Sequence, residues 1–184
     1  MTLRTLTVLS TLMLSSTLVF AAPERETLHV FEDVQEEVHR YAFYTIFDDV
    51  NIGIDEQGVV SLTGYVTGPH KSRDLENRIA GVKGVTAIVN ALEVLRVSRH
   101  DDKLRNAVAR AIYGNTHFWR YAIGSSTPPI HIVVSRGHVT LTGVVTNAFD
   151  RQLAETFARR VLAFSVTNEL RTNKEARAEL ELLN

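Results

Sequence analysis

The pattern of hydrophobic and polar residues along the chain occurs twice. Residues 58–67 read GVVSLTGYVT and residues 137–146 read GHVTLTGVVT, so most positions agree at an offset of 79 residues. Apolar residues such as Val60 and Leu62 alternate with polar ones, which is the period of a β-strand with one buried face. The leading glycine suits a turn, and the second glycine suits a bulge or a close backbone approach. The pattern predicts two equivalent strands.

Similar elements are expected around each copy. Around the first copy we expect residues 23–28 as a flexible lead-in, a helix capped by Asp33 with an inward stripe from Val34 to Thr45, a strand at 50–54, a helix starting at Pro69, and a strand at 85–94. Around the second copy we expect a helix capped by Asp101 or Asp102, a strand at 130–134, a helix starting at Asn147, and a strand at 164–170. In the last helix, Phe149, Leu153, Phe157 and Val161 form the expected inward stripe.

This order, α-β-β-α-β in both halves, predicts an α+β fold. We expect two small tandem domains at 33–96 and 101–172, each a three-stranded sheet with two helices on one face. A short polar linker joins them, and a charged tail at 173–184 is composed of good helix formers. Domains of this size lie near the lower limit for a self-sufficient core.

The largest difference between the copies lies between the first helix and the first strand of the second copy. Residues Tyr113–Pro129 form an insert with no counterpart in the first copy, and it includes Phe118, Trp119, Arg120 and Tyr121. Aromatic rings beside a cation favour an anionic membrane interface. The alternative is that the rings fold back onto a small core or onto the seam between the domains, and the sequence leaves both interpretations open.

The amino terminus has the pattern of a secretory signal peptide. A short region with Arg4 precedes an uncharged apolar stretch at 6–20, and small residues end it, so we expect residues 1–21 to be removed by cleavage near Ala21. The stretch is short and rich in Ser and Thr for a membrane anchor. We therefore expect an exported, periplasmic protein.

The net charge of −1 conceals an uneven distribution. Residues 24–97 carry 7 Lys and Arg against 13 Asp and Glu, whereas residues 99–184 carry 12 against 8. The first half is therefore acidic and the second basic, which would let the second half face an anionic partner; drift on solvated surfaces would give the same counts. The chain has no cysteine, which excludes disulfides, thiolate chemistry and a lipidated N-terminal Cys.

No motif in the chain carries catalytic chemistry. The seven histidines lack metal-ligand spacing, although His131 and His138 lie near one hairpin; Ser125 and Ser126 lack a nucleophile elbow, and no glycine-rich phosphate loop is present. We expect no enzyme, no cofactor, no metal and no small-molecule substrate. Export and a modest basic charge also argue against nucleic-acid binding.

The repeated pattern resembles the BON family of small bacterial domains. The residues that carry the resemblance are Gly58-x-Val60-x-Leu62-x-Gly64-x-Val66, Gly84-Val85 and Asn90-x-Leu92 in the first copy, and Gly137-x-Val139-x-Leu141-x-Gly143-x-Val145 and Asn168-x-Leu170 in the second. The second copy departs from the pattern at Ala163, where a glycine is expected before the last strand. The resemblance implies the α-β-β-α-β fold, export, no catalysis, and the osmotically inducible periplasmic type, with a role in osmotic or envelope stress.

For function, the resemblance implies binding to phospholipid or to the envelope surface. We expect peripheral binding of anionic phospholipid membranes, and the candidate lipid-binding residues are Phe118, Trp119, Arg120, Tyr121, Arg151, Arg159 and Arg160. Two alternatives remain: a periplasmic chaperone or adaptor that binds other exported proteins, and a structural spacer with an envelope partner.

Overall fold

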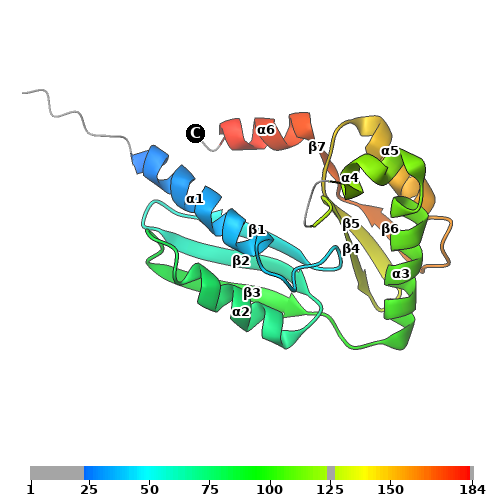
Figure 1. Ribbon diagram of the computed structural model, residues 1–184, viewed down its shortest axis with the longest axis horizontal. Helices are drawn as coiled ribbons and strands as arrows, with labels where there is room; N and C mark the ends of the chain where they lie inside the picture. Colours follow the sequence, from blue (N-terminus) through cyan, green and yellow to red (C-terminus); the bar gives the residue numbers. More distant parts are fainter. Residues whose placement is uncertain (1–22, 124–126, 183–184) are drawn as a thin grey trace, which may run out of the picture.

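The computed structural model describes residues 23–123 and 127–182. The predicted signal peptide therefore lies outside the described residues. Figure 1 shows two α+β domains side by side, each built from a sheet and its own helices. The α+β class and the tandem arrangement are confirmed.

The first domain contains two helices and three strands. Their bounds are α1 Pro23–His39, β1 Asp49–Ile54, β2 Val59–Val66, α2 Pro69–Ile79 and β3 Ala87–Val94. The sheet order is β1-β2-β3; β1 and β2 form an antiparallel hairpin, and α2 carries the chain over to β3, which is parallel to β2. Val34 of α1, Leu62 of β2 and Leu75 of α2 are buried together in its core.

The second domain repeats this plan and adds to it. Its elements are α3 Arg99–Tyr113, the 3₁₀ helix η1 Thr116–Phe118, α4 Trp119–Ala122, β4 Ile130–Ser135, β5 His138–Val145, α5 Ala148–Ala158, β6 Ser165–Asn168, β7 Arg171–Thr172 and α6 Asn173–Leu182. The sheet order is β4-β5-β6, and the short β7 also pairs with β5, so this sheet has one strand more than predicted. The charged tail forms α6.

The second glycine of each repeated segment has a steric cause. Gly64 and Gly143 adopt φ angles of 109° and 104°, which disfavour any residue with a Cβ. A Cβ would also stand 2.2 Å from the carbonyl oxygen of Asp49 at Gly64, and 2.0 Å from that of Pro129 at Gly143. The glycines thus let the first strand of each hairpin approach the second.

The repeated asparagine ties the last strand of each domain to the helix before it. The side-chain amide of Asn90 donates to the Ser72 carbonyl over 3.2 Å, and that of Asn168 donates to the Arg151 carbonyl over 3.0 Å. The side-chain oxygen of each asparagine accepts a bond from the backbone N–H two residues further on, over 3.2 Å in both domains. A hydrogen-bonding role therefore explains the repeated Asn-x-Leu pattern.

Several expectations about helix starts are wrong. Helix α3 begins at Arg99 and is capped by Ser98, whose hydroxyl accepts the Asp101 N–H over 3.2 Å, so neither Asp101 nor Asp102 is the cap. Helix α1 begins at Pro23, so residues 23–28 form its start and Asp33 lies in its interior instead of capping it. The helix extends this far because Val30, Val34 and Val38 bury one continuous stripe, and it ends at His39, before Thr45.

Of the predicted inward stripe, Phe157 is in the core and Leu153 and Val161 pack against it, so the expectation fails only at Phe149. Asp150, Ala154, Phe157 and Ala158 are buried, whereas Phe149 is exposed. The neighbouring Asp150 takes the buried position in the first turn of α5 and makes polar contacts with the insert.

The two domains meet along the edge of the second sheet. The backbone N–H of Ile132 in β4 donates to the carbonyl of Ile46 over 2.7 Å, which pairs the outer edge of β4 with the loop before β1. The His131 ring donates from Nδ1 to the Asp48 carbonyl over 2.6 Å and packs on the Tyr44 ring, 5.4 Å between centroids. Ile46 also packs against the core of the second domain. The first domain therefore covers an edge that would otherwise expose unpaired backbone groups.

Candidate functional site

The aromatic insert of the second domain is a folded part of that domain. Phe118, at the end of η1, is completely buried and packs edge-on against Phe157 of α5 with 6.0 Å between ring centroids. Tyr121 in α4 is also buried. These two of the predicted lipid-binding residues thus lie in the core, as the packing alternative proposed.

The insert is held by one buried carboxylate, Asp150, near the start of α5. The Tyr121 hydroxyl donates to Asp150 over 2.5 Å, Nε2 of His117 donates over 2.7 Å, and the Arg120 guanidinium forms an ion pair with it. Burial alone would raise the pKa of Asp150, but the hydrogen bonds from Tyr121, His117 and Arg120 outweigh burial and lower it. Asp150 is therefore ionised at neutral pH and fixes three residues of the insert.

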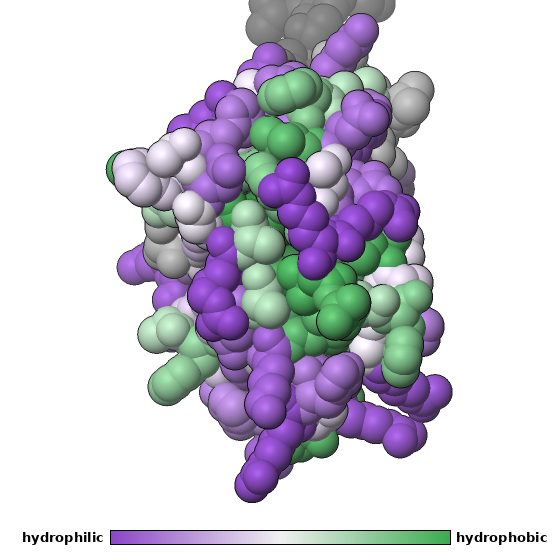
Figure 2. Space-filling view, turned by 90° about the vertical axis from the view of Figure 1, so that its right-hand side faces the viewer, coloured by the Kyte–Doolittle hydropathy of each residue, from purple (hydrophilic) through white to green (hydrophobic). Residues whose placement is uncertain are grey.

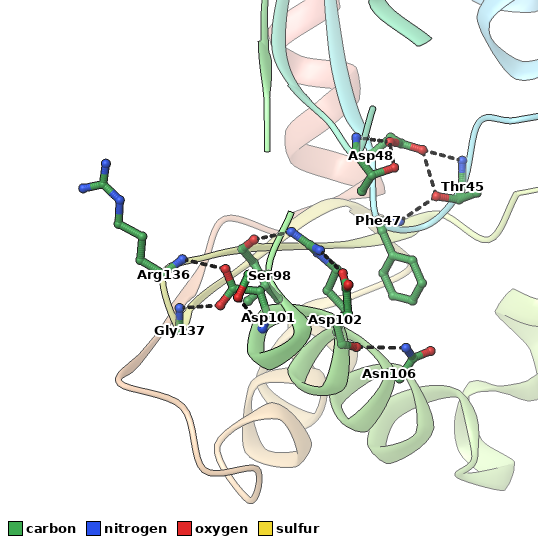
Figure 3. A network of polar contacts seen from close by, with 12 residues as sticks. Thr45, Phe47, Asp48, Ser98, Asp101, Asp102, Asn106, Arg136 and Gly137 are labelled. Atoms are coloured by element: carbon green, nitrogen blue, oxygen red, sulfur yellow. Dashed lines mark hydrogen bonds and ion pairs between the residues drawn. The ribbon is translucent and has the colours of Figure 1, made fainter. Parts of the chain in front are cut away.

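The first domain has the same polar anchor with the charges exchanged. Lys71 is the third residue of α2, as Asp150 is the third residue of α5, and its Nζ lies 2.6 Å from the buried carboxylate of Asp48. Asp48 also accepts bonds from the backbone N–H and hydroxyl of both Thr45 and Thr67, and the contact to Thr45 is visible in Figure 3. In both domains an ion pair thus fastens the segment before the first strand to the second helix.

Three large apolar side chains remain exposed around the insert: Trp119, Ile123 and Phe149. Trp119 is 54 % exposed, and the Phe149 ring packs edge-on against His117 with 5.7 Å between centroids. Phe149 and Arg151 lie in the first turn of α5, and Trp119 precedes Arg120, which pairs with Asp150 of the same turn. The two arginines have carboxylate partners, because Arg120 pairs with Asp150 and Arg151 with Glu175 at 3.0 Å.

The remaining predicted arginines lie at the carboxyl end of α5. Arg159 pairs with Glu155 at 2.7 Å, and the Arg160 guanidinium lies over the Phe157 ring, 4.8 Å from its centroid. An 11-residue helix is about 16 Å long, so the structure divides the candidate residues between its two ends instead of bringing them together.

At this carboxyl end the structure shows exposed residues that sequence reasoning missed. Leu162 and Phe164, in the loop between α5 and β6, are 95 % and 78 % exposed, and Arg136 is exposed on the neighbouring β4–β5 turn. Figure 2 shows the side of the second domain that lies on the right of Figure 1, where hydrophobic residues gather among hydrophilic ones. The sequence held one sign of this exposure. The loop is shorter than its counterpart in the first domain, and Phe164 occupies the position of the polar Thr86.

Residues 23–123 and 127–182 contain neither a metal-binding cluster nor a membrane-spanning helix. In these ranges no three His, Asp or Glu side chains come together in a way that could hold a metal ion, and His131 and His138 face different partners. No helix in the same ranges is both long and apolar enough to cross a bilayer.

Solved structures that are similar to this chain include two from Chlamydia trachomatis. They are CdsD, a structural protein of the type III secretion system, and the C-terminal domain of the same protein. The first aligns over 85 % of this chain and 99 % of its own length at 12 % identity with a TM-score of 0.31, and the second over 78 % and 96 % at 12 % identity with a TM-score of 0.30. A comparison with curated proteins found no match.

The comparison with protein families identifies one matching family. The BON domain model matches residues 33–96 and again residues 100–174. BON domains are non-catalytic and are associated with membrane or protein interactions, which supports an envelope-associated, non-enzymatic role. The two matches cover most of the chain, and the protein therefore belongs to the BON domain family as a tandem two-BON protein.

Proposed function

We propose that this protein is an exported, non-enzymatic protein of the periplasm whose second domain binds the surface of anionic phospholipid bilayers. It contacts the bilayer peripherally, through side chains at the domain surface. A role in osmotic or envelope stress fits this proposal.

The observation that carries the proposal is the pairing of exposed apolar side chains with arginines on the second domain. Trp119 and Phe149 lie near Arg120 and Arg151, and Leu162 and Phe164 lie near Arg159, Arg160 and Arg136. Apolar side chains that leave water for the interface and cations that meet anionic head groups are the two contributions to peripheral binding. The first domain has fewer Lys and Arg than Asp and Glu, so its net negative charge opposes the second contribution.

The expected affinity is weak and sensitive to salt. Each basic residue near an anionic surface contributes about 1 kcal/mol, and the attraction decays over about 8 Å at physiological ionic strength. A few arginines therefore give reversible binding, to which inserted apolar side chains add a part that salt does not screen.

Co-sedimentation with vesicles tests the proposal. The chain from residue 22 is mixed with vesicles of phosphatidylcholine alone or with added phosphatidylglycerol, at low salt and at about 1 M salt, where the screening length is about 3 Å. We expect binding that requires phosphatidylglycerol and weakens at high salt. If the chain ignores both kinds of vesicle at low salt, the proposal is wrong.

The same exposed apolar side chains favour one alternative, a periplasmic chaperone or adaptor that holds exported proteins. Suppressed aggregation of an unfolded client in the absence of lipid, together with no vesicle binding, would select this alternative.

A further inference from the structure

We propose that the bilayer is contacted by the end of the second domain that lies opposite the insert. We name this end the basic tip: Arg136 on the β4–β5 turn, and Arg159, Arg160, Leu162 and Phe164 at the end of α5 and in the loop that follows. Leu162 and Phe164 enter the interfacial region of an anionic bilayer, and the arginines meet its phosphate groups. This inference rests on the proposed function and specifies its site.

The two parts of the basic tip are held together by backbone contacts. The Phe164 N–H donates to the Gly137 carbonyl over 2.9 Å, and the Phe164 ring lies so close to Gly137 that a Cβ there would stand 2.7 Å from it. The His138 ring also packs against the Phe164 ring, with 5.7 Å between their centroids. Phe164 and Leu162 are therefore exposed on a fixed loop beside the turn that carries Arg136.

The charges of the basic tip are less neutralised than those around the insert. Among the described residues no carboxylate pairs with Arg136 or Arg160. Asp101, the acidic residue nearest the turn, is buried and accepts the backbone N–H groups of Arg136 and Gly137 over 3.0 and 2.8 Å. Figure 3 shows these two bonds and the Arg136 side chain pointing away from them. The guanidinium is thus free to meet an external anion.

The backbone of Arg136 provides a second, independent observation. Its φ angle is 53°, and it is the one described non-glycine residue with positive φ. With Gly137 at 81° it forms a two-residue hairpin turn of type I′, where Asn, Asp or Gly is preferred. A strained residue in a turn that a common residue would fit better indicates selection for its side chain.

The first domain serves as an internal comparison. Its equivalent turn carries Asp55 and Glu56, and its equivalent loop carries Lys83 with Val82 and Val85 only partly exposed. The same fold thus presents acidic groups in the first domain, and cations with two exposed apolar side chains in the second. The strands and helices correspond, so the difference lies in the turn and the loop, which differ in length and in side chains.

The insert is the weaker candidate for contact with the bilayer. Phe118 and Tyr121 are buried, Arg120 is paired with Asp150, and Arg151 is paired with Glu175. Trp119 and Ile123 remain exposed there, but both arginines predicted for lipid contact at this end are paired with carboxylates.

Paired substitutions at the two ends of α5 test the inference. Vesicle binding is measured for Leu162→Ser with Phe164→Ser, and for the matched control Trp119→Ser with Ile123→Ser. Moving one such side chain from water into the bilayer interface strengthens binding about ten-fold. The Leu162→Ser, Phe164→Ser variant should therefore bind vesicles at least about ten-fold more weakly. The Trp119→Ser, Ile123→Ser variant should keep most of its affinity. Thermal melting verifies that both variants are folded.

Fluorescence distinguishes the two ends without loss of binding. Trp119 is the one tryptophan of the chain, so its emission should stay unchanged when anionic vesicles are added. Phe164→Trp in a Trp119→Phe background should instead shift its emission to the blue. If Trp119 shifts and the new tryptophan does not, the basic tip is wrong while membrane binding stands; if no vesicle binds the chain, the proposed function itself fails.

Arg136→Asn separates a role in lipid binding from a role in stability. Asparagine fits the left-handed turn better, so the melting temperature should be unchanged or higher, while affinity for anionic vesicles at low salt should fall roughly five-fold for the lost cation. Unchanged affinity would remove Arg136 from the site.

Discussion

Single buried residues carry the stability of these two small cores. Leu62 and Leu141 occupy the same position of the repeated segment, and both side chains are completely buried. Asp48 and Asp150 are also completely buried, and each is satisfied by several donors. Both kinds of residue act through burial, apolar in one case and polar in the other.

Leu62→Ala and Leu141→Ala should each destabilise the protein by about 2–5 kcal/mol, because a large-to-small change loses transfer free energy and leaves a cavity. Urea unfolding followed by circular dichroism measures the loss. Val97→Ala, at a side chain that is 96 % exposed, is the matched control and should change little. Melting curves unaffected by both leucine substitutions would contradict their assignment to the cores.

Asp48 should make stability depend on pH in the acid range. Burial opposes its ionisation, but hydrogen bonds from Lys71, Thr67 and Thr45 outweigh burial and lower its pKa below the ordinary 3.8. The unfolded state therefore binds the proton first, so this contribution is complete above about pH 4 and is lost as pH falls through the lowered pKa. Asp48→Asn should remove that dependence from unfolding curves measured between about pH 2 and 5.

As a control, Glu93→Gln at an exposed position should leave the acid dependence of stability as it is. An unchanged acid profile in Asp48→Asn would show that this carboxylate is not responsible.

Lys71→Met should lower the free energy of unfolding by about 3–5 kcal/mol at neutral pH, because Asp48 then keeps a buried charge without its cation.

At the scale of elements, the insert is a folded extension joined to α5 through Asp150. The helices η1 and α4 are too short to be stable alone, so their conformation depends on the residues they pack against. Phe118 supplies the apolar contact and Asp150 the polar one.

Asp150→Asn should therefore loosen the insert without unfolding the domain. The buried Tyr121 hydroxyl keeps an acceptor in Thr146, at 2.9 Å, so we expect a loss of about 1–3 kcal/mol. Limited proteolysis should cleave the segment after Trp119 faster, and the Trp119 emission should shift to the red. Gln152→Ala, on the exposed side of the same helix, is the control; equal cleavage in both variants would refute the anchoring role.

At the scale of the whole molecule, the seam decides how the two domains sit. The loop before β1 extends the outer edge of β4, and His131 joins the same loop through the Asp48 carbonyl. Burial lowers the pKa of His131, against the opposing influence of Asp49 and of the Asp48 carbonyl. The seam therefore holds a neutral histidine at neutral pH.

The protein should lose stability as pH falls below 6.5. The unfolded chain takes up a proton on His131 near that pH, whereas the folded chain resists it until a lower pH. His131→Phe should flatten this part of the profile, because it removes the titrating group and keeps a ring against Tyr44. His100→Gln, at an exposed position, should keep the slope; a slope that persists in His131→Phe would assign it to other histidines.

The sequence by itself determined the repeated fold. Strand alternation around Leu62 and Leu141, and the need for glycine at 64 and 143, are local properties, because they depend on which face a side chain takes and on the room beside its own Cα. The repeated asparagines, Asn90 and Asn168, were visible in the sequence as part of the pattern, but their role appears only in the structure, where each bonds to the helix before its strand.

The tertiary structure decided which surface residues are available. Whether Phe118 faces solvent or the core, and whether Phe149 points inward, depends on Phe157 and Asp150, which lie more than 30 residues from Phe118 along the chain. The exposure of Leu162 and Phe164, and the nearness of Phe164 to the Arg136 turn, also arise only when β5 and β6 pair. The period of the hydrophobic residues and their helix or strand propensity determine the elements, whereas contacts between distant segments determine which side chains remain exposed and can bind a partner.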